Sequence, residues 1–163
     1  MTTSSFLDYY DKLRGRTMNV VRCIPPDQIG WTCRPGQWTL GDLCRHMALV
    51  EAETFGECLQ GRPTRYRSCG PEHGATLDEV IALMERLHRE TTEMIGRFSD
   101  EDLQAKCTSP AGVPITRWKL LRALTEHEIH HRGQLYVYLG ILGVPTPSLF
   151  GLTERDLASR SLG

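Results

Sequence analysis

Residues 116–142 read TRWKLLRALTEHEIHHRGQLYVYLGIL, and this stretch indicates the fold more clearly than any other part of the chain. Apolar side chains recur through it at helical spacing, and Gly143 and Pro145 follow as helix-ending residues. We therefore predict one long amphipathic helix here. Its apolar face must be covered by other parts of the protein.

Three further amphipathic helices are predicted upstream, over residues 6–24, 39–59 and about 76–98. Pro25 and Pro26 stop the first of them. A capping box, in which a threonine is followed three residues later by an acidic residue, begins each of the other two: Thr39 with Asp42, and Thr76 with Glu79.

No segment shows sustained strand-like alternation, so the expected fold class is all-α, a four-helix bundle. The connections are long, including the Gly- and Pro-containing segment 61–75, which does not suit a simple up-down-up-down order. We expect a single domain over residues 1–163, with a core of about 6–143. The tail, residues 144–163, has no clear periodicity.

The composition is that of an ordinary globular protein. Of the 163 residues, 40% are hydrophobic and 24% are charged, and 19 Lys and Arg against 20 Asp and Glu leave a net charge of -1. Because there is no basic run to hold a phosphate backbone, nucleic acid is not an expected partner.

The cellular location is inferred from the cysteines and from the apolar segments. The six cysteines form no CxxC pair, and a chain with this much core does not need disulfides, so free thiols are expected. Neither a signal peptide nor an apolar run of about 20 residues is visible. We expect a cytoplasmic protein that does not enter a membrane.

His127 and His131 lie about 40° apart around the predicted helix and one turn apart along it, the spacing at which two imidazoles bind one metal ion. Leu120, Tyr138 and Ile141 fall within about 40° of His127, so the pair is expected on the buried stripe. Two buried histidines need polar partners, and a metal ion satisfies both. Hydrogen bonds to side chains or water are the alternative.

A third ligand is expected from the second helix, where His46 shares a face with apolar neighbours. Glu53 falls near the same face and is predicted to support a ligand, the alternative being an ordinary surface carboxylate. Gln134 shares the stripe of His127 and is given the same supporting role. His130, at the stripe edge, either supports a ligand or meets solvent. The remaining histidines are expected to be structural or incidental: His73 and His88.

The segment from His127 to His131 also matches HExxH, the zinc-protease signature, in which Glu128 would be the general base. This interpretation is the weaker one. Glu128 falls about 60° beyond His131 around the helix, and no strand is predicted that could hold a peptide substrate.

Two blocks of sequence resemble the DinB-like (DinB/YfiT) superfamily of bacterial metal-binding four-helix bundles. Residues 36–46, GQWTLGDLCRH, resemble that family's Trp-Ser/Thr helix start, which leads to its first ligand histidine. Residues 127–135, HEIHHRGQL, resemble its His-x-x-x-His-x-Gly-Gln block. The resemblance implies an up-down-down-up bundle, commonly a homodimer, that holds one divalent ion through His46, His127 and His131.

The resemblance also suggests an activity, because characterised relatives include thiol-dependent S-transferases and a mycothiol-dependent isomerase. We expect a metal-dependent enzyme that transfers a low-molecular-weight thiol to or from a small electrophile. Histidine ligands do not distinguish Zn, Ni, Fe or Mn. The alternatives are a non-catalytic metal-binding stress-response module and, less favoured, an HExxH zinc hydrolase. No catalytic residue is assigned.

Overall fold

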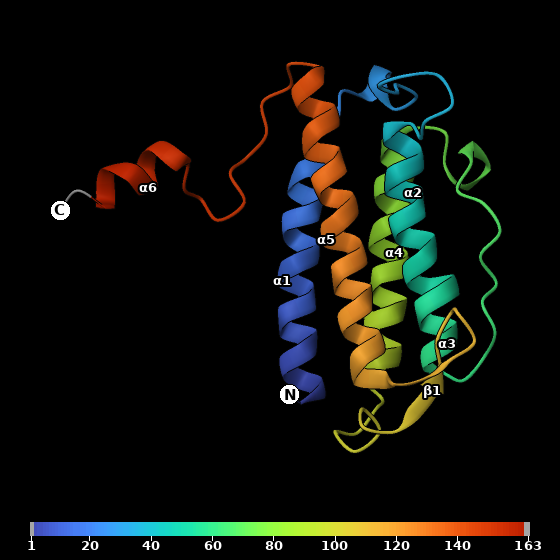
Figure 1. Ribbon diagram of the computed structural model, residues 1–163. Helices are drawn as coiled ribbons and strands as arrows, with labels where there is room; N and C mark the ends of the chain where they lie inside the picture. The colour runs from blue at the N-terminus through green and yellow to red at the C-terminus, as the bar shows by residue number, and fades with distance from the viewer. Residues whose placement is uncertain (1, 162–163) are drawn as a thin grey trace.

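The structure of the protein is a computed structural model, which describes residues 2–161 (Figure 1). Four long helices form a bundle: α1 (Thr3–Val21), α2 (Leu40–Val50), α4 (Leu77–Ile95) and α5 (Arg117–Ile141). A π-helical segment, Glu51–Gly56, and the short α3 (Glu57–Leu59) continue α2.

The helices follow the order up-down-down-up, as expected. In Figure 1, α1 rises from the N-terminus, α2 and α4 both descend, and α5 rises again. The long connection between α3 and α4 makes this possible, because it returns the chain from the bottom of the bundle to the top. Each helix packs against two others: α1 against α4 and α5, and α2 against α4 and α5.

The predicted helix starts are confirmed. The Thr39 hydroxyl accepts from the amide of Asp42, and the Asp42 carboxylate accepts from the amide of Thr39. Thr76 and Glu79 form the same capping box. The first helix begins earlier than predicted, because Thr2 caps it together with Ser5.

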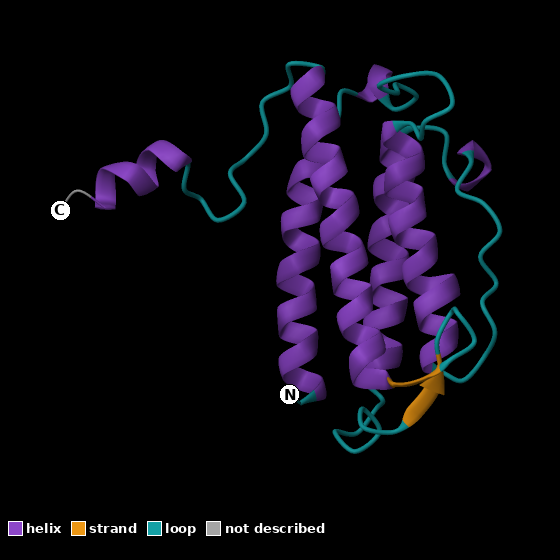
Figure 2. Ribbon diagram, viewed as in Figure 1, coloured by secondary structure: helices purple, strands orange, loops and turns teal. Residues whose placement is uncertain are grey.

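Three short elements were not expected. Strands β1 (Lys106–Thr108) and β2 (Pro114–Thr116) pair antiparallel below the bundle (Figure 2). With three residues each, they are too short to show an alternating pattern. Helix α6 (Glu154–Ser161) lies in the tail and projects away from the bundle in Figure 1. It buries no residue, so it has no apolar stripe to reveal it.

The core consists of two apolar halves with a polar layer between them. One half includes Met18 of α1 and Leu135 of α5, and the other includes Leu13 and Leu124 of the same helices. Buried charged residues lie between these positions along α1 and α5: Arg14, Glu128 and Arg132. Glu51 of the π-helical segment and His88 of α4 join this polar layer through hydrogen bonds.

The buried face of α5 differs from the stripe predicted from the sequence. It centres near Glu128, about 100° around the helix from His127, so the two histidines lie toward its edge. Ile141, predicted on the buried stripe, is 61% exposed. The hydrophobic pattern was misleading because Glu128 and Arg132 occupy positions that normally carry apolar side chains.

Within residues 2–161, no helix combines the length and apolar character needed to cross a bilayer. All six cysteines are free thiols, as expected.

Candidate metal centre

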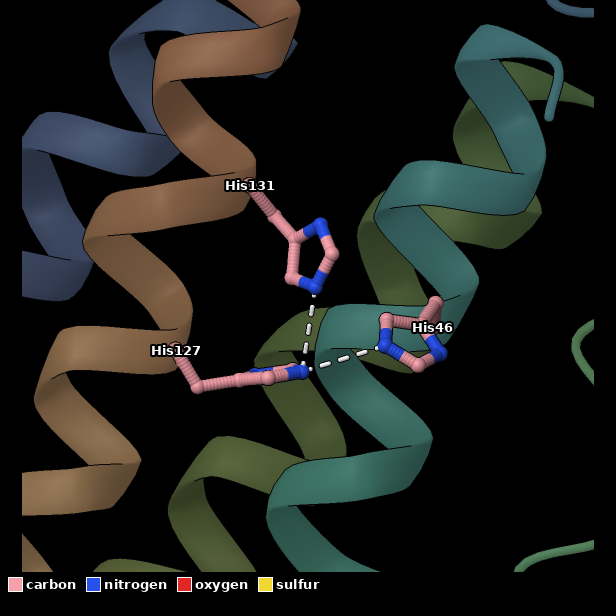
Figure 3. Close-up of side chains that lie close together, drawn as sticks. All are labelled: His46, His127 and His131. Atoms are coloured by element: carbon pink, nitrogen blue, oxygen red, sulfur yellow. Dashed lines mark hydrogen bonds between the residues drawn. The ribbon is translucent and has the colours of Figure 1, made fainter. Parts of the chain in front are cut away.

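Three histidines meet in the space between α2 and α5 (Figure 3). The Nε2 atom of His127 lies 3.1 Å from Nε2 of His46 and 3.1 Å from Nε2 of His131. One ligand atom from each ring falls within 4.8 Å of the others. The structure thus brings together the three residues that the spacing and the resemblance had singled out.

The nitrogen positions suit a single divalent cation. Two nitrogens bound to one tetrahedral zinc ion at 2.0–2.1 Å lie about 3.3 Å apart, close to the two separations of 3.1 Å found here. Protons on the rings satisfy these contacts poorly, because each neutral imidazole carries only one N–H and Nε2 of His127 faces both other rings. A cation in the centre would accept all three lone pairs at once.

The outer nitrogens of two of these rings are held by hydrogen bonds. Nδ1 of His131 donates to Oε1 of Gln134 at 2.6 Å, which leaves Nε2 of His131 as a free lone pair. Nδ1 of His46 lies 2.9 Å from the Tyr66 hydroxyl. Such partners orient a ligand ring and select its tautomer. Gln134 is therefore placed where its predicted supporting role requires.

Glu53 takes a different place from the one predicted. Among the described residues, its carboxylate makes no hydrogen bond to the three histidines. The reason is the π-helical segment 51–56, whose wider turns change the direction of every side chain that follows. Instead, its backbone carbonyl accepts from the amide of Arg65 at 2.8 Å and thereby fixes the chain next to Tyr66.

Tyr66 was missed in the sequence because it lies in the irregular connection 60–76, where no periodicity points to a role. Arg45, next to His46, holds the far part of this connection. Its guanidinium donates to the carbonyls of Cys69 and Gly74, both at 2.7 Å, and pairs with Asp42. The connection is thus anchored on both sides of Tyr66.

Burial keeps the three rings uncharged. Burial, together with the neighbouring histidines, which act in the same direction, lowers the pKa of His46 to about 4 and that of His127 to about 3. Burial also lowers the pKa of His131, against the opposing effect of Gln134. At neutral pH all three are in the form that binds a metal ion.

Trp38 covers the outer side of the site. Its ring centroid lies 4.4 Å from that of His46 and 5.7 Å from that of His131, and the side chain is 40% exposed. A cavity of about 160 Å³ adjoins it, with Gln134 and Tyr138 in its lining. The site therefore has an aromatic wall that solvent and small molecules can reach.

The acidic residue of the HExxH match lies elsewhere. Glu128 is 2% exposed and pairs with Arg14 in the polar layer of the bundle. Within residues 2–161, no aspartate, glutamate or cysteine joins the three histidines as a further ligand. The arrangement therefore differs from that of an HExxH hydrolase, in which the glutamate acts beside the metal.

The other histidines do not join the site as ligands. His130 is exposed, and its ring centroid lies 4.9 Å from that of His131. His88 bridges Glu51 and Asp11, which is a structural role. His73 lies in the connection beside Glu72.

Solved structures share this fold. A DinB-like protein from Bacillus cereus has a TM-score of 0.74 at 21% identity, over 90% of this chain and 97% of its own. A DinB-like protein from Bacillus subtilis has a TM-score of 0.69 at 17% sequence identity, over 89% of this chain and 97% of its own. YfiT from B. subtilis has a TM-score of 0.70 at 17% sequence identity, over 88% of this chain and 89% of its own. It is described as a "probable metal-dependent hydrolase with an unusual four-helix bundle topology".

At these identities the structural likeness shows the fold alone. No curated protein matches the chain significantly. The model of the DinB superfamily, however, matches residues 9–135, which include all three histidines, the whole of α2 and α4, and most of α1 and α5. This protein belongs to the DinB superfamily.

Proposed function

We propose that the protein is a metal-dependent enzyme that transfers a low-molecular-weight thiol to or from a small electrophile. The observation that carries the proposal is the convergence of three uncharged imidazole nitrogens, from His46, His127 and His131, without a fourth protein ligand among the described residues. Three protein ligands leave coordination positions for water or substrate, as in catalytic rather than structural sites.

When bound, a divalent ion in this position would lower the pKa of a thiol or water and polarise an electrophile. The chain itself supplies orientation and shielding. Tyr66 and Gln134 hold two of the imidazoles in place. Trp38 forms an apolar wall against which the carbon skeleton of a small substrate can pack.

The surroundings favour a thiol over water as the nucleophile. Water must lose a proton from a pKa of 15.7, and metal hydrolases often assist this with a nearby carboxylate, whereas a thiol starts from about 8.5. The carboxylate that the HExxH match suggested as a general base, Glu128, is bound to Arg14 instead. With Glu128 engaged in this way, the site suits the more acidic nucleophile.

The thiol would come from outside the protein. Cys44 is the cysteine nearest to a ligand in the sequence, but it is fully buried, and burial raises its pKa to about 12. A thiol of that pKa is inert at neutral pH. We expect Cys44→Ser to retain activity. The six free thiols suit the reducing cytoplasm, which we propose as the protein's location.

Hydrolysis is the second candidate, since three histidines also hold the zinc ion that activates water in carbonic anhydrase. The description of YfiT as a metal-dependent hydrolase supports it. The two are separated by assaying the protein, loaded in turn with Zn, Ni, Mn or Fe, against small electrophiles and esters with and without added thiols. Thiol-dependent turnover that is lost in His131→Ala supports transfer, and thiol-independent turnover supports hydrolysis. If no metal gives any turnover, the result supports the third alternative, a non-catalytic metal-binding module.

We also propose that the protein forms a homodimer through the outer face of α5. Ile129, Val137 and Ile141 are 42%, 60% and 61% exposed there, and Gly133 offers room for close approach. Light scattering should give the mass of two chains, and Val137→Glu should give that of one. A wild-type monomer at micromolar concentration would contradict this.

A further inference from the structure

One arginine joins the two helices that carry the histidines. Nη2 of Arg14, on α1, donates to Oε2 of Glu51 at 2.5 Å and to Oε2 of Glu128 at 2.9 Å. The three side chains are 5%, 0% and 2% exposed. This buried Arg14–Glu51–Glu128 cluster lies in the polar layer between the two apolar halves of the core.

Each carboxylate is closely linked to a ligand along the chain. Glu51 follows His46 by five residues, at the point where α2 becomes π-helical, and Glu128 follows His127 directly. Helix α1 contributes no ligand. A single nitrogen of Arg14 therefore ties together α2 and α5, the two helices whose separation determines whether the three imidazoles converge.

Simple stabilisation does not account for such a cluster. Removing three charged groups from water is costly, and apolar residues of the same volume often stabilise a core as well or better. A guanidinium instead supplies a fixed geometry, in which one nitrogen binds two carboxylates. The two hydrogens of one planar nitrogen point in fixed directions, which lysine, with its rotating ammonium group, cannot reproduce.

The carboxylate on α2 is held on both of its oxygens. Oε1 of Glu51 lies 2.9 Å from Nδ1 of His88, while Oε2 binds Arg14. Burial alone would raise the pKa of Glu51, but Arg14 and His88 lower it below its usual value, so the ion pair persists. Glu51 cannot turn away without losing two buried hydrogen bonds, one to Arg14 and one to His88.

We propose that Arg14 is a positioning residue for the metal centre: by binding Glu51 and Glu128 it sets the separation of α2 and α5, and with it the distance from His46 to His127 and His131. This inference rests on the proposed metal site.

The test is titration of the full-length, metal-free protein with Co²⁺, which reports affinity and, through its visible absorption band, ligand geometry. Arg14→Lys and Glu128→Gln should each weaken Co²⁺ binding about 10-fold, the lower end of the loss known for residues that support a metal site, and shift the band. Leu13→Ala is the matched control. It removes a buried side chain from the adjacent position of α1, and it should keep the wild-type affinity and band while lowering stability.

Several outcomes would overturn the inference. One is a folded Arg14→Lys or Glu128→Gln protein with wild-type affinity and absorption, and another is an equal effect of Leu13→Ala, which would reduce Arg14 to general core support. If Arg14→Lys does not fold, Glu128→Gln provides the test, because it keeps the size of the side chain. Failure of the wild-type protein to bind Co²⁺ would overturn the metal site itself and this inference with it.

Discussion

Glu128 accepts a hydrogen bond from Arg14 at 2.9 Å, although it stands next to His127 in the sequence. Adjacent residues of a helix point about 100° apart, so His127 faces the metal site while Glu128 faces the centre of the bundle. The HExxH pattern in this chain therefore combines two separate structures, a histidine site and part of a buried ion cluster.

The histidine assignment predicts the effects of removing single ligands. His46→Ala, His127→Ala and His131→Ala should each reduce metal affinity by at least about 100-fold, since loss of an outer partner alone costs about 10- to 100-fold. Elemental analysis after dialysis measures this. His73→Ala, in the connection, should retain the metal. Full occupancy in the double variant His127→Ala/His131→Ala would show that the ion is bound elsewhere.

The outer hydrogen bonds make a second prediction. Tyr66→Phe and Gln134→Leu should each weaken metal binding about 10-fold, because the ring beyond each loses its orienting partner. Glu53→Gln is the matched control and should have no effect, since the contact from Glu53 to the connection is made by its backbone. Isothermal titration with Zn²⁺ distinguishes these variants. If Glu53→Gln weakened metal binding as much as Tyr66→Phe, the Glu53 carboxylate would have to support a ligand after all.

The unfolding free energy of the metal-free protein should decrease in two stages as the pH is lowered. The folded pKa values of His46 and His127, about 4 and 3, lie below the unfolded value of about 6.5, so unfolding takes up protons once the pH falls below that value. Each such proton contributes a slope of about 1.4 kcal/mol per pH unit. The lowered pKa of Glu51 adds a second loss below about pH 4.3.

Urea unfolding between pH 7.5 and 4 measures this dependence. His127→Ala should reduce the slope in the first stage, because one proton fewer is taken up on unfolding. A constant unfolding free energy from pH 7.5 to 5 would show that the histidines are solvated and titrate normally in the folded state.

The polar layer predicts ordered internal water. Among the described residues, buried polar atoms around Arg14 have no hydrogen-bond partner: the Tyr10 hydroxyl, Nε and Nη1 of Arg14, and Oε1 of Glu128. Water can accept from the arginine and donate to the carboxylate, and buried waters in proteins typically bind polar groups that lack a protein partner. A high-resolution crystal structure should show it.

The sign of one substitution gives an independent test of this hydration. If the Tyr10 hydroxyl binds water, Tyr10→Phe should lower the unfolding free energy by about 1 kcal/mol. If the hydroxyl is truly without a partner, the same substitution should stabilise the protein, because the cost of burying that group is removed. Increased stability of Tyr10→Phe would therefore exclude the water.

Much of the architecture was determined by the sequence itself. Helix caps and helical periodicity are local properties, so Thr39, Thr76 and the apolar spacing of residues 116–142 suffice to place the long helices. The pairing of His127 with His131 is equally local, since four residues make one turn. The choice of His46 needed only the face of one further helix.

What lies beyond a single helix was decided by the tertiary structure. Tyr66 reaches His46 because a connection without periodicity is anchored by the carbonyl of Glu53 and the guanidinium of Arg45. The π-helical segment changes the helical phase, which a uniform 100° per residue cannot represent. Glu128 is buried because Arg14, more than a hundred residues away in the sequence, compensates its charge. Such compensation depends on the packing of separate helices, and no local pattern of residues contains it.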